Sequence, residues 1–397
     1  MIEEVKEVAH VGQHLLGRIC RGGALVVLLG LGILRLQADL PAAGAAGAPE
    51  EKLPNKTNTG ISNAPEASPR VMLPFVSGSA QPPSVPLLIG VATPGQYFGT
   101  QGVVDSYLKG LDSWVGLSKP GKGHSIAEDF EDLNPFPPNQ ANHTDSYVAG
   151  PLTLFWNNGY TDFLNLGSTA SSAAIANGCC DAGITAWARS IATWINRGGG
   201  HKLYIAPLQE MNGNWTSYGM DPANFKLAYQ HIQALFASVG VTRGKVWWVF
   251  APNGWSTPPY HIVDYYPGDD KVDIIGFSSY NQSCRAAWMN PTEVFDPYLQ
   301  EIRTTVSTSK PIFVAQTATS SAKGNKDQWI RDAYSYFLAQ GIRGVLYYNA
   351  DLECDWAVYQ PPNAGGRQVQ GYKDAVTAPN ATRYIAPATL SGMTLPP

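Results

Sequence analysis

The sequence predicts an α/β protein built as one (β/α)8 barrel over residues 86–377. Eight short apolar runs alternate with helical patterns across about 300 residues, which is the length that such a barrel requires. Most of these runs are almost continuously apolar, as is typical of parallel strands that are buried on both faces. Thr93, Pro94 and Gly95 follow the first run, and they do not form the glycine-rich phosphate loop that a doubly wound sheet would favour.

The strands and helices can be placed from these patterns. The helix predicted after the fourth strand begins with Asp221 as N-cap and Pro222 in the first turn, and Gly240 ends it. A second strongly periodic helix follows the seventh strand and ends at Gly341. The predicted strands are 87–93, 123–130, 151–156, 202–208, 245–251, 273–278, 311–316 and 344–349.

The segments outside the barrel have a different composition. Arg18 and Arg21 precede an apolar run and then a stretch of small residues, so residues 1–38 are predicted to be a cleaved secretory signal or an uncleaved anchor. Residues 39–85 are rich in Pro, Ala and Ser and are predicted to be a disordered linker, and residues 378–397 a C-terminal tail. We therefore expect a secreted or extracellular protein, with a possible membrane tether at the N-terminal segment.

Composition excludes several classes of protein. The net charge is −4 and only 15% of the residues are charged, so no basic stripe is present to bind nucleic acid. No His or Cys spacing resembles a metal clamp, and we expect no metal, no cofactor and a monomer. Four cysteines lie in the domain and allow three pairings, among which the sequence does not choose: Cys179, Cys180, Cys284 and Cys354.

The carboxyl ends of the predicted strands carry amides, carboxylates and aromatic residues. In a barrel of this kind, catalytic side chains lie at these ends. This mixture suits a neutral sugar, because amides and carboxylates bond to hydroxyl groups and aromatic rings stack on pyranose faces. The residues expected to contact such a ligand are Gln209, Asn212, Trp215, Asn253, Tyr280, Trp356 and, after the predicted third strand, Trp156.

Glu210 is the leading catalytic candidate. It directly follows an apolar strand, where loss of solvent raises the pKa of a carboxyl and prepares it to act as a general acid. A glutamate that merely caps the following loop is the competing interpretation.

Three stretches resemble glycoside hydrolase family 26, the β-mannanase family. Residues 207–215 (PLQEMNGNW) are similar to its acid/base signature. Residues 310–320 (KPIFVAQTATS) with 327–331 (DQWIR) resemble its nucleophile strand and helix, and residues 344–349 with Asp355 and Trp356 resemble its eighth strand and the loop beyond. The likeness spans roughly residues 86–360.

The resemblance implies a retaining glycosidase that acts on a β-linked polysaccharide, with β-1,4-mannan expected first. Glu210 is implied as acid/base, position 316 as nucleophile, Tyr280 as the partner of the nucleophile and Trp356 as a wall of the sugar site. The chain departs from the family at three places. It has Gln209 where the family has His and Ala206 where the family has Arg, and the nucleophile position holds Gln316 instead of Glu.

Gln316 leaves several interpretations open, because a neutral amide lacks the charge of the usual nucleophile and retaining hydrolysis needs two carboxyl groups about 5 Å apart. Another carboxylate could replace it, with two groups of candidates: Asp351 and Glu353 after the eighth strand, and Asp129, Glu131 and Asp132 around the second strand. An inverting route could pair Glu210 with a carboxylate roughly 6.5–9.5 Å away. The chain could also be a glycan-binding pseudoenzyme, carry an engineered substitution that traps substrate, or be a purely structural surface protein.

Overall fold

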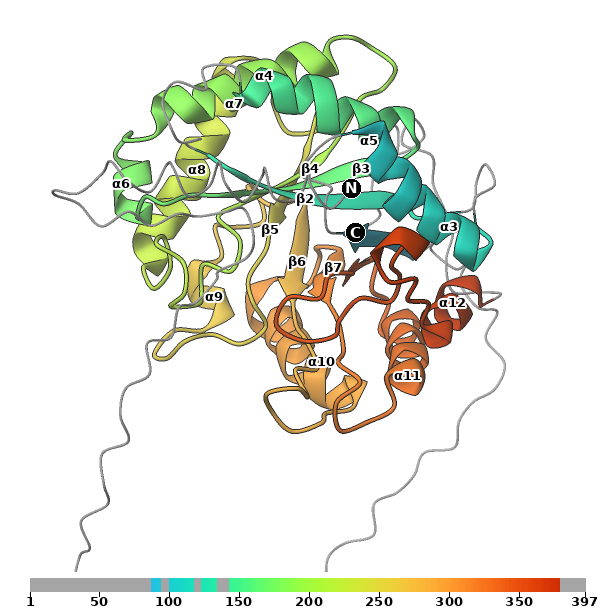
Figure 1. Cartoon of the computed structure of the whole chain (residues 1–397). Helices are drawn as coiled ribbons and strands as arrows, with labels where there is room; N and C mark the ends of the chain where they lie inside the picture. The colour runs from blue at the N-terminus through green and yellow to red at the C-terminus, as the bar shows by residue number, and fades with distance from the viewer. Residues whose placement is uncertain (1–86, 94–99, 118–122, 134–142, 379–397) are drawn as a thin grey trace, which may run out of the picture. The chain divides into compact units, whose positions relative to one another are not determined.

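The computed structural model describes residues 87–93, 100–117, 123–133 and 143–378, which form a closed barrel of eight parallel strands in sequential order (Figure 1). The barrel closes where β1 pairs with β8, with Leu88 beside Gly344 and Ala92 beside Tyr348. The predicted (β/α)8 fold is therefore confirmed. The strands are β1 (Leu88–Ala92), β2 (Ile126–Asp132), β3 (Thr161–Gly167), β4 (Tyr204–Pro207), β5 (Trp247–Phe250), β6 (Ile274–Ser278), β7 (Ile312–Thr317) and β8 (Gly344–Tyr348).

Helices surround the strands on the outside of the barrel (Figure 1). In α8, Asp221 accepts a hydrogen bond from the backbone N–H of Asn224, and Gly240 follows the helix at a φ of 89°, as the sequence predicted. The α-helices are α2 (Gln101–Val103), α3 (Gly110–Val115), α4 (His143–Tyr147), α5 (Thr153–Asn157), α6 (Ser172–Ala176), α7 (Asp181–Ile195), α8 (Pro222–Ser238), α9 (Ile262–Tyr265), α10 (Pro291–Glu301), α11 (Lys326–Ala339) and α12 (Gln370–Thr377). Shorter π-helical and 3-10 segments are η2 (Val104–Lys109), η3 (Val148–Leu152), η4 (Ile302–Val306) and η5 (Pro362–Ala364).

The third predicted strand is wrong. Residues 151–156 belong to η3 and α5, where Val148, Leu152 and Phe155 are buried at steps of four and three residues, which is the helical period. The true third strand is β3, which contains the polar residues Asp162 and Asn165 and therefore lacks an apolar appearance. All the other predicted strands overlap an observed one.

Aromatic rings fill the amino-terminal half of the barrel lumen. The Tyr204 ring stacks on Trp247 at 4.6 Å between centroids, and it lies 5.7 Å from both Phe163 and Phe313. The ammonium group of Lys202 lies 3.9 Å from the Trp247 ring and covers this layer. The lumen is therefore a packed core below the carboxyl ends of the strands, and polar side chains just above it lie against an apolar floor.

One disulfide joins two loops at the carboxyl ends of the strands. It links Cys284, which follows β6, to Cys354, which follows β8, and it spans 70 residues. Among the described residues Cys179 and Cys180 are free thiols, with their sulfur atoms 2.8 Å apart. The structure thus selects one of the three pairings that the sequence left open.

The predicted targeting segment 1–38, the linker 39–85 and the tail beyond residue 378 lie outside the described residues. Within the described ranges, none of the helices has both the length and the apolar character that crossing a membrane requires.

Loss of the disulfide should destabilise the barrel. Because a cross-link over 70 residues restricts the unfolded chain, we expect Cys284→Ser to lower the free energy of unfolding by about 2–4 kcal/mol. Chemical denaturation with and without reductant measures this effect, and Cys179→Ser/Cys180→Ser is the matched control that keeps the cross-link. Equal midpoints for Cys284→Ser and the natural chain would contradict the prediction.

Candidate functional site

Polar side chains from six strands meet at the carboxyl end of the barrel, above the aromatic floor. The loops after β4 and β5 supply Glu210 and Asn253, and the loop after β6 supplies Tyr280. Gln316 lies on β7, and β2 and β3 contribute Glu128 and Asn165.

The carboxyl group of Glu210 is held from two sides. The indole N–H of Trp215 donates to its Oε2 at 2.9 Å, and the Nδ2 of Asn253 donates to its Oε1 at 2.9 Å. Burial raises the pKa of Glu210, while these two hydrogen bonds act against the rise. The residue itself has a φ of 55° in the left-handed region, and its backbone N–H donates to Ala251 at 2.7 Å. The loop geometry thus fixes the direction of this carboxyl.

Asn212 fixes the loop on which Glu210 depends. Its Oδ1 accepts from the backbone N–H of Asn253 at 2.8 Å, and its Nδ2 donates to the Asn253 carbonyl at 2.7 Å and to Ser256 Oγ at 2.8 Å. Asn212 is fully buried, so the prediction that it contacts the ligand is wrong. It is a positioning residue that joins the loops after β4 and β5. Gln209 is half-buried beside Glu210, and its Oε1 is buried without a partner in the described structure.

Gln316 lies between a tyrosine and a buried carboxyl group. The Tyr280 hydroxyl donates to Gln316 Oε1 at 2.5 Å, as the resemblance implied for the partner of this position. The Gln316 Nε2 donates to Glu128 Oε1 at 2.7 Å, and Asn165 Nδ2 donates to the same oxygen at 2.9 Å. The second oxygen of Glu128, Oε2, is buried and has no hydrogen-bond partner in the described structure.

Glu128 is the residue that sequence reasoning missed. It is 1% exposed, and burial raises its pKa to about 8, with the charge of Glu210 adding to the rise. The sequence predicted candidates among the acidic residues around the second strand, namely Asp129, Glu131 and Asp132, but not Glu128. Side chains alternate along a strand, and Glu128 shares the lumen-facing phase of Ile126, whereas Asp129 faces the helices. The alternation of side chains along β2 could therefore have identified Glu128 from the sequence.

The other proposed carboxylates have different partners. Asp129 is buried on the outer face of the barrel, so its assignment to the site is wrong. Burial raises the pKa of Asp129, and the nearby charge of Asp162 adds to this rise. Asp351 is exposed and lies 2.7 Å from Arg367 in an ion pair. Glu353 is also exposed and pairs with Arg285 at 3.1 Å, although its charge contributes to the raised pKa of Glu210.

Two stacked aromatic pairs accompany the polar groups. Trp215 and Trp255 stack at 6.1 Å and 16° beside Glu210, and Trp255 is 51% exposed. The Trp215 ring lies so close to Gly213 that a Cβ there would be 2.3 Å from it. Tyr280 and Trp356 stack at 5.2 Å and 23° beside Gln316, with Trp356 buried. Each pair therefore flanks one member of the Glu210–Gln316 pair.

Trp156 is not part of this site. It lies at the end of α5, before β3, and its ring packs edge-on against Trp194 at 5.6 Å and His201 at 5.0 Å. Its assignment to the ligand site followed from the wrong third strand, and the observed position is at the amino-terminal end of the barrel.

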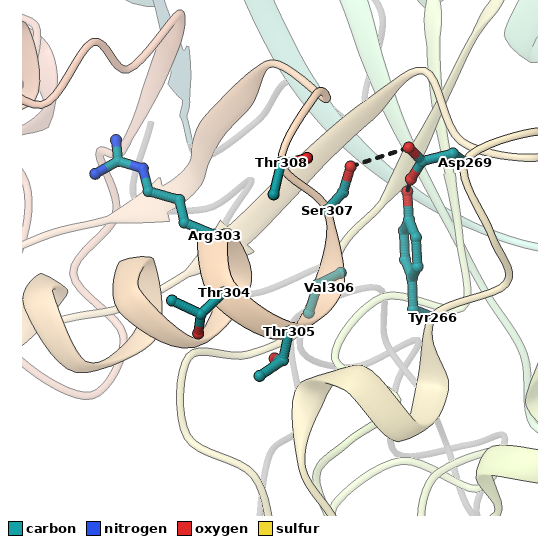
Figure 2. A pocket seen from close by; sticks show the side chains of 8 residues that line it. All are labelled: Tyr266, Asp269, Arg303, Thr304, Thr305, Val306, Ser307 and Thr308. Atoms are coloured by element: carbon teal, nitrogen blue, oxygen red, sulfur yellow. Dashed lines mark hydrogen bonds between the residues drawn. The ribbon is translucent and has the colours of Figure 1, made fainter.

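A hollow elsewhere on the protein is lined by none of the residues described above (Figure 2). It is lined by segments that precede β6 and β7, so it lies toward the amino-terminal end of the strands. Asp269 accepts hydrogen bonds there from the Tyr266 hydroxyl at 2.6 Å and from Ser307 at 3.2 Å. Because these polar groups satisfy one another, we assign the hollow no role. Its lining residues are Tyr266, Asp269, Arg303, Thr304, Thr305, Val306, Ser307 and Thr308.

The sequence of this chain is similar to sequences of known glycoside hydrolases. Residues 180–339 match the sequence model of glycosyl hydrolase family 26. The chain is 26% identical over 305 residues to endoglucanase H of Acetivibrio thermocellus, covering 71% of the chain and 32% of that protein. It is 23% identical over 220 residues to β-1,3-xylanase TXYA of a Vibrio species, covering 48% and 44%. The chain thus spans less than half the length of either curated relative.

Solved structures share the barrel. The family 26 β-mannanase from Bacteroides ovatus matches with a TM-score of 0.53 and 14% identity, over 78% of this chain and 94% of that one. The modular endo-β-1,4-mannanase from Cellulomonas fimi matches with a TM-score of 0.52 and 14% identity, over 77% and 74%. At these identities the likeness is one of fold.

Neutralising Glu128 should change how stability depends on pH. Its pKa is about 8 in the folded protein and 4.5 in the unfolded chain, so only the unfolded chain readily releases this proton. Ionisation therefore lowers the stability of the natural chain as pH rises from about 4.5 to about 8, by up to about 1.4 kcal/mol for each pH unit. Glu128→Gln keeps an oxygen for Gln316 and Asn165 but cannot ionise. We expect its advantage in free energy of unfolding to grow between pH 5 and pH 8.

Urea denaturation at pH 5, 6.5 and 8 measures this difference. The control is Glu353→Gln, which changes an exposed carboxylate of the same type. A stability difference between Glu128→Gln and the natural chain that stays constant over this range would refute the assignment of a raised pKa.

Proposed function

We propose that this chain, which belongs to glycosyl hydrolase family 26, hydrolyses a β-linked polysaccharide with Glu210 as general acid and base. The observation that carries the proposal is the carboxyl of Glu210, held by Trp215 and Asn253 at the barrel mouth with a pKa raised by burial. A raised pKa favours the protonated form of a carboxyl, and a protonated carboxyl can donate its proton to a departing glycosidic oxygen.

We propose β-1,4-mannan as the first substrate to test. The family assignment and the shared fold of the β-mannanases support this choice. The names of the two curated relatives point to other glycans, an endoglucanase and a β-1,3-xylanase. Mixed-linkage glucan and β-1,3-xylan therefore belong in the same assay.

A specific observation favours a second candidate function. Gln316 is a neutral amide at the nucleophile position, and an ordinary retaining mechanism needs a carboxylate there. A protein that binds β-glycan in the cleft and does not cleave it would be compatible with this residue. Release of reducing sugar by the natural chain separates the two functions.

We also propose that the protein acts outside the cytosol. The Cys284–Cys354 disulfide supports an oxidising compartment, and the predicted signal or anchor in residues 1–38 agrees with export. Fractionation of cells that express the full chain tests this proposal, and a cytosolic location would contradict it.

Replacement of Glu210 should abolish most of the hydrolysis. For Glu210→Gln we expect kcat/KM on polysaccharide to fall by about 10²- to 10⁴-fold, because the leaving oxygen loses its proton donor. On an aryl glycoside with a dinitrophenolate leaving group, which needs no proton, bond cleavage should be much less affected. The control is Asp332→Asn, an exposed carboxylate on α11 that we expect to leave activity unchanged. Equal losses on both substrate types would argue against a general acid.

The Trp255 ring should contribute to ligand binding. Its exposed face lies in the stacked pair beside Glu210 and can accept a pyranose ring on the leaving-group side. For Trp255→Ala we expect binding of mannohexaose to weaken by about 5- to 10-fold, which corresponds to about 1–1.4 kcal/mol. Isothermal titration measures this change, with Leu227→Ala, another exposed apolar residue, as control. Unchanged affinity for Trp255→Ala would exclude the stacking role.

A further inference from the structure

The Gln316 amide has its oxygen and its nitrogen committed to different partners. Oε1 accepts from the Tyr280 hydroxyl at 2.5 Å, and Nε2 donates to Glu128 Oε1 at 2.7 Å. An amide oxygen has two lone pairs, so Oε1 keeps one for a further interaction. Gln316 is 7% exposed and Glu128 is 1% exposed, which makes the amide the part of this pair that a ligand can reach.

Glu128 is placed to receive a proton from that amide. Its Oε1 already accepts from Nε2, while its Oε2 is buried and unpartnered. Burial raises the pKa of Glu128 to about 8, so the ionised form that can accept a proton is the minor form below that pH, and this form is a stronger base than an exposed carboxylate. Gln316 occupies the position where the family has a nucleophilic carboxylate, and the carboxyl group of Glu128 is hydrogen-bonded to it.

Amide oxygens can attack an anomeric carbon. Glycosidases that use substrate assistance rely on the amide oxygen of the sugar's own 2-acetamido group. Attack through oxygen places positive charge on the amide, and loss of the N–H proton removes that charge. An amide of the protein can act in the same way if a base accepts its N–H proton, and the Gln316–Glu128 hydrogen bond meets this requirement.

We propose that Gln316 is the nucleophile of this protein through its Oε1, and that Glu128 is the base that accepts the Nε2 proton. This inference rests on the proposed hydrolase function. In the first step a lone pair of Oε1 forms a bond to the anomeric carbon, and the bond from that carbon to the leaving oxygen breaks. The leaving oxygen takes its electron pair and the proton of Glu210, and Nε2 transfers a proton to the ionised carboxyl of Glu128. The product is a neutral glycosyl imidate on Gln316.

The second step reverses these transfers. Glu210, now ionised, removes a proton from water, and the water oxygen bonds to the anomeric carbon. The bond from that carbon to Oε1 breaks, its electrons restore the amide carbonyl, and Glu128 returns its proton to Nε2. Two displacements at one carbon retain its configuration, and no group from outside the site is consumed except water. Tyr280 and Asn165 act as positioning residues for the amide and for the base.

Trapping the intermediate tests the proposal directly. The natural chain is incubated with dinitrophenyl 2-deoxy-2-fluoro-β-mannoside, whose fluorine slows the second step, and intact mass is recorded. We expect one added fluorosugar, mapped by peptide sequencing to Gln316. An adduct on any other residue, or none in a chain that hydrolyses polysaccharide, overturns the proposal.

Variants separate the base from a structural role. For Glu128→Gln we expect kcat/KM to fall at least 10²-fold with mannohexaose affinity unchanged, because Gln keeps the acceptor oxygen and loses the basicity. Gln316→Glu/Glu128→Gln returns a carboxylate to β7, and we expect it to recover hydrolysis. The matched control is Asp129→Asn, the adjacent buried carboxyl that faces the helices, with activity within about 3-fold of the natural chain.

These experiments separate a wrong role for Glu128 from a wrong hydrolase function. If the natural chain hydrolyses polysaccharide and Glu128→Gln hydrolyses it equally well, the role of Glu128 is wrong while the hydrolase function stands. If the natural chain binds glycan and hydrolyses none, the proposed function fails, and the amide mechanism fails with it.

Discussion

The hydrogen bond from Gln316 to the buried carboxyl of Glu128 is the constraint on which the site depends. It joins β7 to β2 across the barrel lumen, and Asn165 on β3 completes it. A carboxyl in this position lies above a layer of aromatic rings and is costly to ionise, so its surroundings must supply donors. The Gln316 amide in turn accepts from the Tyr280 hydroxyl, and the Tyr280 ring stacks on Trp356.

A second set of contacts holds Glu210. Asn212 contributes no contact to a ligand, yet its buried amide fastens the loop after β4 to the loop after β5. Asn253 is therefore in place to bond Glu210, and Trp255 follows it with its ring stacked on Trp215. Glu210 and its aromatic neighbours are therefore held by the same few hydrogen bonds between loops. The disulfide ties the loops after β6 and β8 on the other side of the mouth.

Because side chains alternate along a strand, the acidic residues of β2 and β3 lie on two different faces of the barrel. Glu128 points into the lumen, and Asp129 and Asp162 point toward the helices, where the Tyr147 hydroxyl donates to Asp162 at 2.6 Å. Both outward carboxyls have raised pKa values because burial disfavours their charged forms. Adjacent carboxyl groups on one strand thus belong to different environments, and the phase of the alternation separates the one that faces the lumen from the one that faces the helices.

Sequence alone determined the barrel, the helix ends at Asp221 and Gly240, and the positions of Glu210, Tyr280 and Gln316. These follow from local periodicity, from capping chemistry and from motifs that lie at strand ends. Tertiary structure decided the third strand, whose polar residues are buried by partners distant in sequence, and it moved Trp156 to the opposite end of the barrel. It also decided the disulfide pairing and the contact of Gln316 with Glu128, which lies 188 residues away in the chain. A hydrogen bond across the lumen exists only when the barrel is closed, so local pattern cannot specify it.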